Sequence, residues 1–332
     1  MQRAWPTPRQ RSRRPAAMIA SNATETAMSN SITEPVTPDQ RSYAAVLSDL
    51  DCGSLGEHIR RPSLATRSIR VGASFTSLDL WYVDLDVTAD ALNCFRQGLS
   101  RDELARAERF HSDLHRARYI VGRATLRRVL ADRLGCSPAT IRLSYGRNGK
   151  PMLEGGRGHV EFNLAHSGGD AVIALADRAA VGVDIELHRP ISDVESLARL
   201  VFSDVERREL KLAPDPVSAF LNGWTRKEAY VKALGIGLTA PLREITVSLS
   251  DGAALFSTGL RDRSASYWRL LSVPHPRAVV AVALGPRLDR ATTTGWLQSK
   301  GELPGLNPAV NCHQMRHIST TMNGGLQRRN PE

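Results

Sequence analysis

The pattern that most restricts the fold of this chain is an order of helices followed by strands that occurs twice. Helical periodicity before Gly135 is followed by strand-like runs as far as Leu187, and helical periodicity before Gly235 is followed by strand-like runs as far as Leu284. Helices and strands that come in separate blocks are typical of α+β architecture. We therefore predict an α+β fold of two similar lobes, each about 100 residues long, that pack together.

Capping signals set the helix boundaries in both halves. Two Ser-x-x-Glu capping boxes begin at Ser100 and Ser203, where the paired side chains would satisfy the first N–H groups of a helix. A helix over 114–134 precedes a glycine, and a second long helix begins at Pro216 and ends at Gly235. Strands are predicted over 78–87, 141–145, 160–165, 171–176, 181–187, 244–250, 268–272 and 278–284.

The net charge of +10 is concentrated at the two ends of the chain. Residues 1–76 hold 10 basic and 6 acidic residues, and residues 287–332 hold 6 and 3, so the middle holds 28 and 25. The middle is therefore not a basic nucleic-acid-binding block, although it can bind an anionic small molecule at one focused site. The polar composition of the ends predicts disordered tails around a first lobe at 77–178 and a second lobe at 179–286.

The sequence disfavours both a membrane protein and a protein stabilised by a disulfide framework. No apolar run approaches the ~18–20 residues that a membrane span needs, so we expect no membrane contact. The chain has four cysteines, which are far apart and form no CxxC pair. This spacing argues against a disulfide framework and against a Cys-rich zinc site, and it favours a reducing cytoplasm.

Two acidic residues, Asp184 and Glu186, lie two positions apart at the end of a predicted strand and therefore point to one face. Two carboxylates about 6 Å apart repel by about 3 kcal/mol at an effective dielectric constant of ~20, so burying both requires a cation. Gly182 would let another backbone or a ligand approach closely. An exposed strand end with two solvated acids remains the alternative from these residues alone.

The second long helix carries Trp224, Glu228 and Lys232 along one stripe, with Lys227 beside Glu228. The plain alternative is a surface Glu–Lys pair that contributes ~0.2–0.5 kcal/mol. Trp224 and Val231 place apolar groups around the same stripe, however, so an acid and a base next to a core face favour a functional site.

Several basic residues could contact an anionic ligand. His166 ends a predicted strand at a Ser-Gly turn, whose free N–H groups suit a phosphate. Lys150 lies in a Gly-Lys-Pro turn, and Arg118 shares a helix with Arg123 and Arg127. For Arg123 we favour a solvated helix face.

Three acidic groups and scattered basic groups together indicate a metal with a phosphorylated ligand. Oxygen-only ligands point to Mg²⁺, which retains water and binds substrate phosphates. The sequence has no Walker A motif, kinase signature set or G-x-S-x-G motif, and no dinucleotide fingerprint beyond chance. The residues alone therefore indicate Mg²⁺-dependent chemistry on a pyrophosphate-like substrate, and nothing more specific.

In combination, six blocks of the chain resemble the 4′-phosphopantetheinyl transferases. Their order and spacing over residues 77–286 are similar to the larger, two-lobed (surfactin-type) branch of the superfamily, which implies a pseudodimeric domain pair with the active site in the cleft between the lobes. It also implies a monomer, because two internal lobes can form the cleft that smaller relatives build between subunits. The blocks are RFHSDLHRARYIVGRATLR at 109–127, GKP at 149–151, FNLAHSGG at 162–169, GVDIE at 182–186, FSDVE at 202–206 and WTRKEAYVKALGIGL at 224–238.

The resemblance implies a reaction and a role for each matching residue. The 4′-phosphopantetheine group of coenzyme A would be transferred to a serine of an apo acyl or peptidyl carrier protein, with release of 3′,5′-ADP. Asp184, Glu186 and Glu228 would bind Mg²⁺, Lys232 would stabilise the transition state at the phosphates, and Glu228 or a metal-bound water would take the serine proton. The residues implied in binding coenzyme A are Arg118, Lys150, His166, Ser167 and Lys232.

One residue departs from the family pattern. Ala165 occupies a position where a serine commonly precedes the motif histidine, which implies that one phosphate contact is absent. The acceptor would be a carrier protein of fatty-acid, polyketide or nonribosomal peptide synthesis. Three alternatives stay open: another Mg²⁺-dependent transferase or hydrolase of a nucleotide pyrophosphate, a nucleic-acid-binding protein that acts through its tails, and a non-catalytic carrier-binding module.

Overall fold

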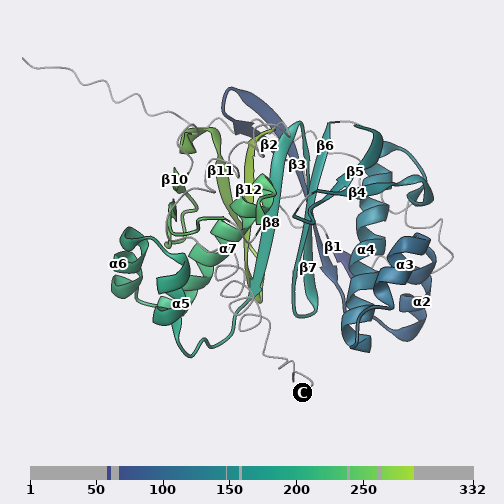
Figure 1. Ribbon diagram of the computed structural model, residues 1–332, viewed down its shortest axis with the longest axis horizontal. Helices are drawn as coiled ribbons and strands as arrows, with labels where there is room; N and C mark the ends of the chain where they lie inside the picture. Colours follow the sequence, from purple (N-terminus) through teal and green to yellow (C-terminus); the bar gives the residue numbers. More distant parts are fainter. Residues whose placement is uncertain are drawn as a thin grey trace, which may run out of the picture. The chain divides into compact units, whose positions relative to one another are not determined.

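Two antiparallel sheets, each covered on its outer side by helices, organise the part of the chain that the structure describes (Figure 1). The computed structural model describes residues 58–60, 67–146, 148–156, 159–237, 240–259 and 264–287. All of them belong to one unit that spans residues 39–332. We call the sheet and helices up to residue 178 the first lobe, and those that follow the second lobe.

The first lobe has a sheet in the order β1-β3-β7-β6, with β2 also paired to β3. All of its pairings are antiparallel. The short strands β4 and β5 form a separate hairpin. The helices are α2 (Ala89–Gln97), α3 (Arg101–Ala107) and α4 (Asp113–Leu134), and the strands are β1 (Ile59–Arg60), β2 (Arg67–Val71), β3 (Ser74–Asp84), β4 (Leu143–Tyr145), β5 (Pro151–Leu153), β6 (Val160–Ser167) and β7 (Asp170–Asp177).

The second lobe repeats this plan with a three-stranded antiparallel sheet in the order β11-β12-β8 and a second, two-stranded pairing of β9 with β10. Its longest helix, α7, crosses the outer face of β8 and β12. The helices are α5 (Val194–Val201), α6 (Asp204–Leu212) and α7 (Pro216–Leu234), and the strands are β8 (Ala179–Leu187), β9 (Ile245–Val247), β10 (Leu255–Thr258), β11 (Arg269–Val273) and β12 (Ala278–Pro286).

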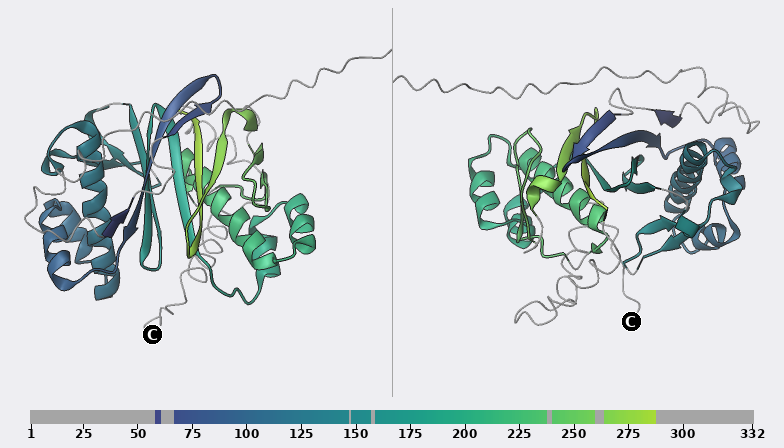
Figure 2. Two further views of the ribbon diagram at one scale, coloured as in Figure 1. Left: turned by 180° about the vertical axis from the view of Figure 1, so that it is seen from behind. Right: turned by 90° about the horizontal axis from the view of Figure 1, so that it is seen from above.

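Three apolar clusters hold these layers together. One lies between α4 and the sheet of the first lobe, and one lies between α7 and the sheet of the second. The third is shared by the two sheets and joins side chains such as Leu80 and Val172 to Val183 and Val282. Figure 2 shows the two sheets adjacent in the middle, with the helices of each lobe on opposite sides. The lobes therefore pack on a common core, and the predicted α+β class with two lobes is confirmed.

The two lobes also meet along the edge strands β6 and β8. The Asn163 Oδ1 atom accepts from the N–H of Val183 at 2.8 Å, and the hydroxyl of Ser167 accepts from the N–H of Leu187 at 3.3 Å. Side chains of the first lobe thus satisfy backbone donors that β8 would otherwise leave open at its edge. This seam fixes the end of β6 beside the end of β8.

The predicted capping signals are present in both lobes. Ser100 with Glu103 opens α3, and Ser203 with Glu206 opens α6, each with both reciprocal hydrogen bonds of a capping box. Helices α4 and α7 end at glycines with left-handed backbone, φ 61° and 69°. Sequence patterns missed α2, α5, β5 and β10, none of which is longer than 9 residues.

Ordered structure begins earlier than the boundary predicted at residue 77. Strands β1, β2 and the first residues of β3 fall inside the 1–76 segment that was expected to be disordered. The rest of that segment, and the predicted tail beyond Arg287, lie outside the described residues. Cys94 is disulfide-bonded, which the wide cysteine spacing did not indicate, and Cys136 has a free thiol. Among the helices that the structure describes, none combines the length and hydropathy that a membrane crossing requires.

Candidate active site

The acidic pair lies on the face of β8 that α7 covers. A Cβ atom on Gly182 would lie 2.0 Å from the carbonyl oxygen of Ala229 and 2.3 Å from the nitrogen of Ala233, so only glycine allows the two elements to approach so closely. The predicted close approach at Gly182 is confirmed, and the partner is the backbone of α7. Asp184 and Glu186 follow on the same face, and they are only 5% and 8% exposed. The alternative of two solvated acids at a strand end is therefore excluded.

Each buried carboxylate has contacts that fix its orientation. Lys232 forms an ion pair with the Oδ1 atom of Asp184. Glu186 accepts from the indole N–H of Trp224 at 3.1 Å and from the hydroxyl of Ser167 at 3.2 Å. Helix α7 supplies two of these partners and β6 supplies the third, so the site joins residues of both lobes.

Burial and mutual repulsion govern the protonation of the three carboxylates. Burial raises the pKa of Asp184, although Lys232 opposes the rise. Burial, followed by the charge of Asp184, raises the pKa of Glu186 to about 8. Burial also raises the pKa of Glu228 to about 7, against the opposing charge of Lys232. One Lys232 cation therefore leaves the negative charge of this cluster incompletely balanced.

The donor set fits a hard divalent cation. The Oδ2 atom of Asp184 and the Oε1 atom of Glu228 are buried and have no hydrogen-bond partner, and unpartnered buried carboxylate oxygens are costly unless a cation binds them. Oxygen-only donors are those that Mg²⁺ prefers. In the described part of the chain, no three acidic, His or Cys side chains already converge on one metal position. The Lys232 ammonium group instead contacts Asp184, and burial, which would lower its pKa, is outweighed by Asp184 and Glu228, so the pKa of Lys232 is raised.

His166 lies at the end of β6, next to this acidic cluster. Its imidazole reaches solvent, yet the surrounding protein and the positive charges of Lys232 and Arg118 lower its pKa. The neutral ring can donate one hydrogen bond and accept another. Ala165, the residue before it, is buried in the apolar cluster between the two sheets, so a hydroxyl at this position would enter an apolar environment.

Lys150 binds the second lobe. Its amino group donates to the carbonyl of Val181 at 3.0 Å and to that of Ala233, in the last turn of α7, at 3.2 Å. Asn148 donates to the carbonyl of Gly235 at 3.0 Å from the same loop. Burial lowers the pKa of Lys150 to about 8. The Gly-Lys-Pro turn therefore anchors the end of α7 that carries Lys232.

Arg118 has a carboxylate partner that sequence patterns did not indicate. Its Nε and Nη2 atoms donate to the two carboxylate oxygens of Asp86 at 2.7 and 2.8 Å. The hydrogen bond from Arg118 lowers the pKa of Asp86. Asp86 lies within the predicted 78–87 strand, but the observed β3 ends at Asp84, and only tertiary packing places Asp86 against α4.

A cavity of about 370 Å³ lies between α4, β6 and the start of β5. Arg118, Arg123 and His166 line it together with apolar side chains, so it combines cations with a surface that can cover a flat or apolar group. It lies near the acidic cluster, because His166, which lines the cavity, is close enough to Lys232 for the charge of that residue to lower its pKa.

Lys227 lies outside the site. Its side chain has no exposed surface and donates to Glu206 at 2.6 Å and to the carbonyls of Val201 and Leu242 at 2.8 Å each. All three of its donors are used. The neighbours Lys227 and Glu228 thus point to different sides of α7, and only Glu228 lies among the acidic residues.

Both lobes of this chain are similar to known proteins. Residues 180–283 match the family model "4′-phosphopantetheinyl transferase superfamily", and residues 86–178 match "4′-phosphopantetheinyl transferase, N-terminal". The chain is 39% identical over 213 residues to the 4′-phosphopantetheinyl transferase HetI of Nostoc sp., covering 62% of this chain and 86% of that protein. It is 31% identical to a putative 4′-phosphopantetheinyl transferase, slr0495, of Synechocystis sp., covering 53% and 72%. It is 29% identical to a 4′-phosphopantetheinyl transferase of Bacillus subtilis, covering 51% and 75%.

Proposed function

Because this chain belongs to the 4′-phosphopantetheinyl transferase superfamily, we propose that the acidic cluster and the adjoining cavity carry out the transfer. The protein is an enzyme that moves the 4′-phosphopantetheine group of coenzyme A to a carrier protein. The single observation that supports the residue assignment best is the group formed by the buried Asp184 and Glu186 of β8 and the partly buried Glu228 of α7. One buried oxygen each of Asp184 and Glu228 has no hydrogen-bond partner.

Asp184, Glu186 and Glu228 would hold Mg²⁺ through their carboxylate oxygens. When bound, the ion would neutralise charge on the pyrophosphate of coenzyme A. Trp224 and Ser167 keep Glu186 oriented through their hydrogen bonds. Lys232 would leave Asp184 for the phosphates and stabilise the negative charge that develops on the leaving group.

The transfer needs a base for the serine hydroxyl of the carrier protein. The serine oxygen attacks the phosphorus that bears pantetheine, the bridging P–O bond breaks, and 3′,5′-ADP leaves. Burial raises the pKa of Glu228 to about 7 in the metal-free site, and bound Mg²⁺ would lower it, which leaves a carboxylate that can accept a proton at neutral pH. Glu228 is therefore our choice for the residue that takes the serine proton.

Coenzyme A would extend from the acidic cluster into the cavity of the first lobe. His166 and Ser167 lie at the junction between the two, and Arg118 lines the cavity. Contacts from Lys150 to the substrate stay a prediction, supported by its place beside the last turn of α7. Apolar walls of the cavity suit the adenine ring, since ligand pockets combine apolar surface with a few polar groups.

We further propose that the acceptors are apo acyl or peptidyl carrier proteins of fatty-acid, polyketide or nonribosomal peptide synthesis. Since both lobes of one chain contribute to the site, a monomer suffices for activity. We place the enzyme in the cytoplasm, where coenzyme A and carrier proteins meet.

The test is intact-protein mass spectrometry of an apo carrier protein incubated with this enzyme, coenzyme A and Mg²⁺. We expect each carrier to gain one phosphopantetheine group, and we expect chelation of Mg²⁺ to prevent the gain. Arg199→Gln, an exposed residue on α5, serves as a control variant that retains activity. Unmodified fatty-acid, polyketide and peptidyl carriers, with coenzyme A bound normally, would contradict the proposal.

A further inference from the structure

The tight turn between β6 and β7 follows directly on a residue that holds the acidic cluster. Ser167 ends β6, Gly168 and Gly169 form the turn, and Asp170 begins β7. Glycine restricts the backbone less than any other residue, and Gly168 has a left-handed φ of 57°. The turn therefore depends on outside contacts to fix its position. Because the hydroxyl of Ser167 donates to Glu186, that position also affects the orientation of a proposed metal-binding carboxylate.

The second lobe contacts this turn at both of its ends. At one end, the hydroxyl of Ser167 donates to the Oε2 atom of Glu186 at 3.2 Å. At the other end, the Nη2 atom of Arg277 donates to the Oδ1 atom of Asp170 at 2.7 Å. Arg277 directly precedes β12, and its carbonyl accepts from the N–H of His188, the residue after β8, at 2.9 Å. The paired ends of β8 and β12 thus hold the turn from two sides.

The surroundings of Asp170 favour this contact. Asp170 is only 8% exposed, and the Nε2 atom of His275 lies 3.9 Å from its Oδ1 atom. The Nδ1 atom of His275 accepts from the N–H of Arg277 at 3.3 Å, so a neutral ring carries its proton on Nε2, which faces Asp170. Both groups belong to the loop between β11 and β12 of the second lobe. The side chain of Arg277 is 68% exposed, so its removal would leave no hole in the core.

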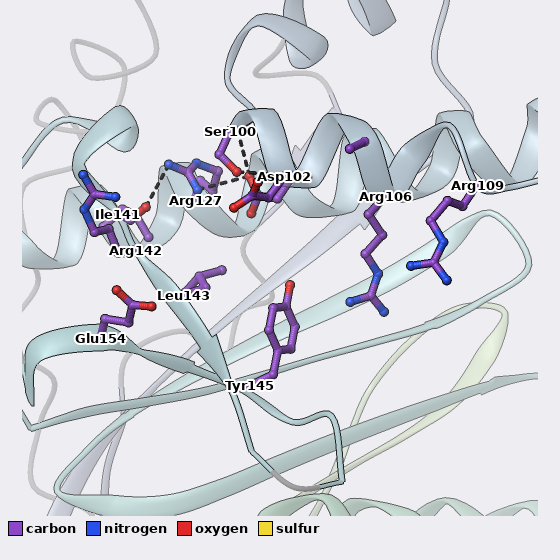
Figure 3. Close-up of a pocket in the computed structure, with 12 residues that line it drawn as sticks. Ser100, Asp102, Arg106, Arg109, Arg127, Ile141, Arg142, Leu143, Tyr145 and Glu154 are labelled. Atoms are coloured by element: carbon purple, nitrogen blue, oxygen red, sulfur yellow. Dashed lines mark hydrogen bonds and ion pairs between the residues drawn. The ribbon is translucent and has the colours of Figure 1, made fainter.

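Other buried ion pairs serve one lobe alone. Figure 3 shows the pocket between α3 and β4 of the first lobe, where Arg127 is bound to Glu103 at 3.1 Å. Arg123 lies 3.8 Å from the same Glu103 and is only 10% exposed, so the solvated position predicted for Arg123 is wrong. The ion pair at the β6–β7 turn differs from these, because it joins the first lobe to the strand that pairs with β8 beside Glu186.

We propose that Asp170 and Arg277 are positioning residues, whose ion pair holds the β6–β7 turn so that Ser167 keeps Glu186 oriented for Mg²⁺. This inference rests on the proposed function, which assigns Glu186 to the metal. Positioning and simple electrostatics predict opposite results for the loss of Arg277. Removing a positive charge near a divalent cation would by itself strengthen Mg²⁺ binding, whereas the loss of a contact that orients a metal ligand weakens it.

The experiment measures the dissociation constant of Mg²⁺ by isothermal titration calorimetry on the full-length enzyme saturated with coenzyme A. For R277Q we expect the constant to rise ~10-fold, as for other contacts that orient metal ligands. R277K should stay within about threefold of the unmodified enzyme, because an ammonium group can also make the single contact to Asp170. R243Q is the matched control, since it removes a similarly exposed arginine paired with Asp204, and it should leave the constant unchanged.

A purely structural role would give a different pattern. The melting temperature of metal-free R277Q should fall by no more than about 4 °C, because an exposed ion pair adds little stability. Its kcat at saturating Mg²⁺ should stay close to that of the unmodified enzyme, because Glu186 itself is retained. A large fall in melting temperature with an unchanged Mg²⁺ constant would overturn the inference, as would tighter binding of Mg²⁺ by R277Q.

D170N tests the same contact from the first lobe, and it replaces R277Q if that variant does not fold. The double variant D170N/R277Q should bind Mg²⁺ no more weakly than the weaker single variant, because both substitutions remove one interaction. Additive losses would overturn the inference. The proposed function is judged separately on the unmodified enzyme: failure to bind Mg²⁺ or to modify a carrier protein refutes it, whereas carrier modification together with an unchanged Mg²⁺ constant in R277Q refutes only the role of the ion pair.

Discussion

The two lobes use the same device to hold their long helices, but they place opposite charges beside it. In the first lobe, the capping-box residue Glu103 is buried against Arg127 of α4. In the second, the capping-box residue Glu206 is buried against Lys227 of α7. Each glutamate therefore caps one helix and pairs with another. The same buried ion pair thus ties a short helix to a long one in each half of the molecule.

The difference between the lobes lies in what surrounds these pairs. Near Arg127, the first lobe places further cations, of which Arg123 is incompletely paired. Near Lys227, the second lobe places Glu228 and the two acids of β8, with raised pKa values. A cationic half and an acidic half suit the two ends of one complex, a phosphorylated nucleoside and a metal-bound pyrophosphate. Similar lobes thus acquired complementary chemistry through a few side chains.

The largest effect is expected from removing the acidic character of the second lobe. Glu228→Gln and Asp184→Asn should each lower turnover by about 10⁴-fold, which is ~5.5 kcal/mol, because a proton acceptor or a metal-binding oxygen is lost. For Glu228→Gln the melting temperature should stay the same or rise, since a neutral amide is easier to bury, whereas Asp184→Asn also loses the ion pair with Lys232 and should be the less stable of the two. Steady-state transfer to a carrier protein and thermal unfolding measure the two effects. Full activity with Mg²⁺ present would refute the metal assignment.

The next largest effect is expected from breaking the buried ion pair between Lys227 and Glu206. This change tests whether the pair is purely structural. Lys227→Met should lower the free energy of unfolding by about 3–5 kcal/mol, because Glu206 would remain as a buried charge without its cation. Denaturant unfolding measures the loss.

The double variant Lys227→Met/Glu206→Gln provides the control for that measurement. It keeps an acceptor for the N–H of Ser203 but loses the one for the N–H of Val247, and it removes the buried charge, so it should regain part of the stability. A single Lys227→Met variant that folds as stably as the unmodified protein, yet loses turnover, would show that Lys227 belongs to the active site after all.

A smaller effect is expected from pH on the metal-free protein. The folded-state pKa of Glu186, about 8, lies above its ordinary value of 4.5, so the folded state binds a proton that the unfolded state releases. Its contribution to stability is full below pH 4.5 and is lost as the pH rises to about 8. The free energy of unfolding, measured at several pH values, should fall more steeply over this range for the unmodified protein than for Glu186→Gln. Saturating Mg²⁺ should abolish this pH-dependent loss of stability. An equal dependence on pH in the two proteins would contradict the prediction.

The smallest effects are expected from exposed ion pairs, of which each lobe offers an example. Arg96 and Glu108 of the first lobe are about half exposed, as are Arg199 and Glu195 of the second. Replacing either arginine by Gln should change the free energy of unfolding by no more than ~1 kcal/mol. A loss of stability as large as that of Lys227→Met would mean that burial does not explain the difference between the buried and the exposed ion pairs.

Local sequence patterns predicted much of this framework correctly. The capping boxes at Ser100 and Ser203, the glycine ends of α4 and α7, and the shared face of Asp184 and Glu186 depend on residues close together in the chain. Gly182 could also be read as a point of close approach. Strands β1 and β2 were missed because they form by pairing with β3, whereas their own residues show no sustained strand pattern.

Partners that come from distant parts of the chain could not be predicted in this way. Lys227 and Glu228 are neighbours in sequence, but Glu206 receives the first while the second lies among the acids of the site. Asp86 compensates Arg118 from 32 positions away, and Tyr145 covers Arg123 from 22. The sequence alone determined which residue types share a helix stripe or strand face, because that follows from backbone periodicity. Tertiary structure decided which charges are compensated, because compensation depends on what packs against each face.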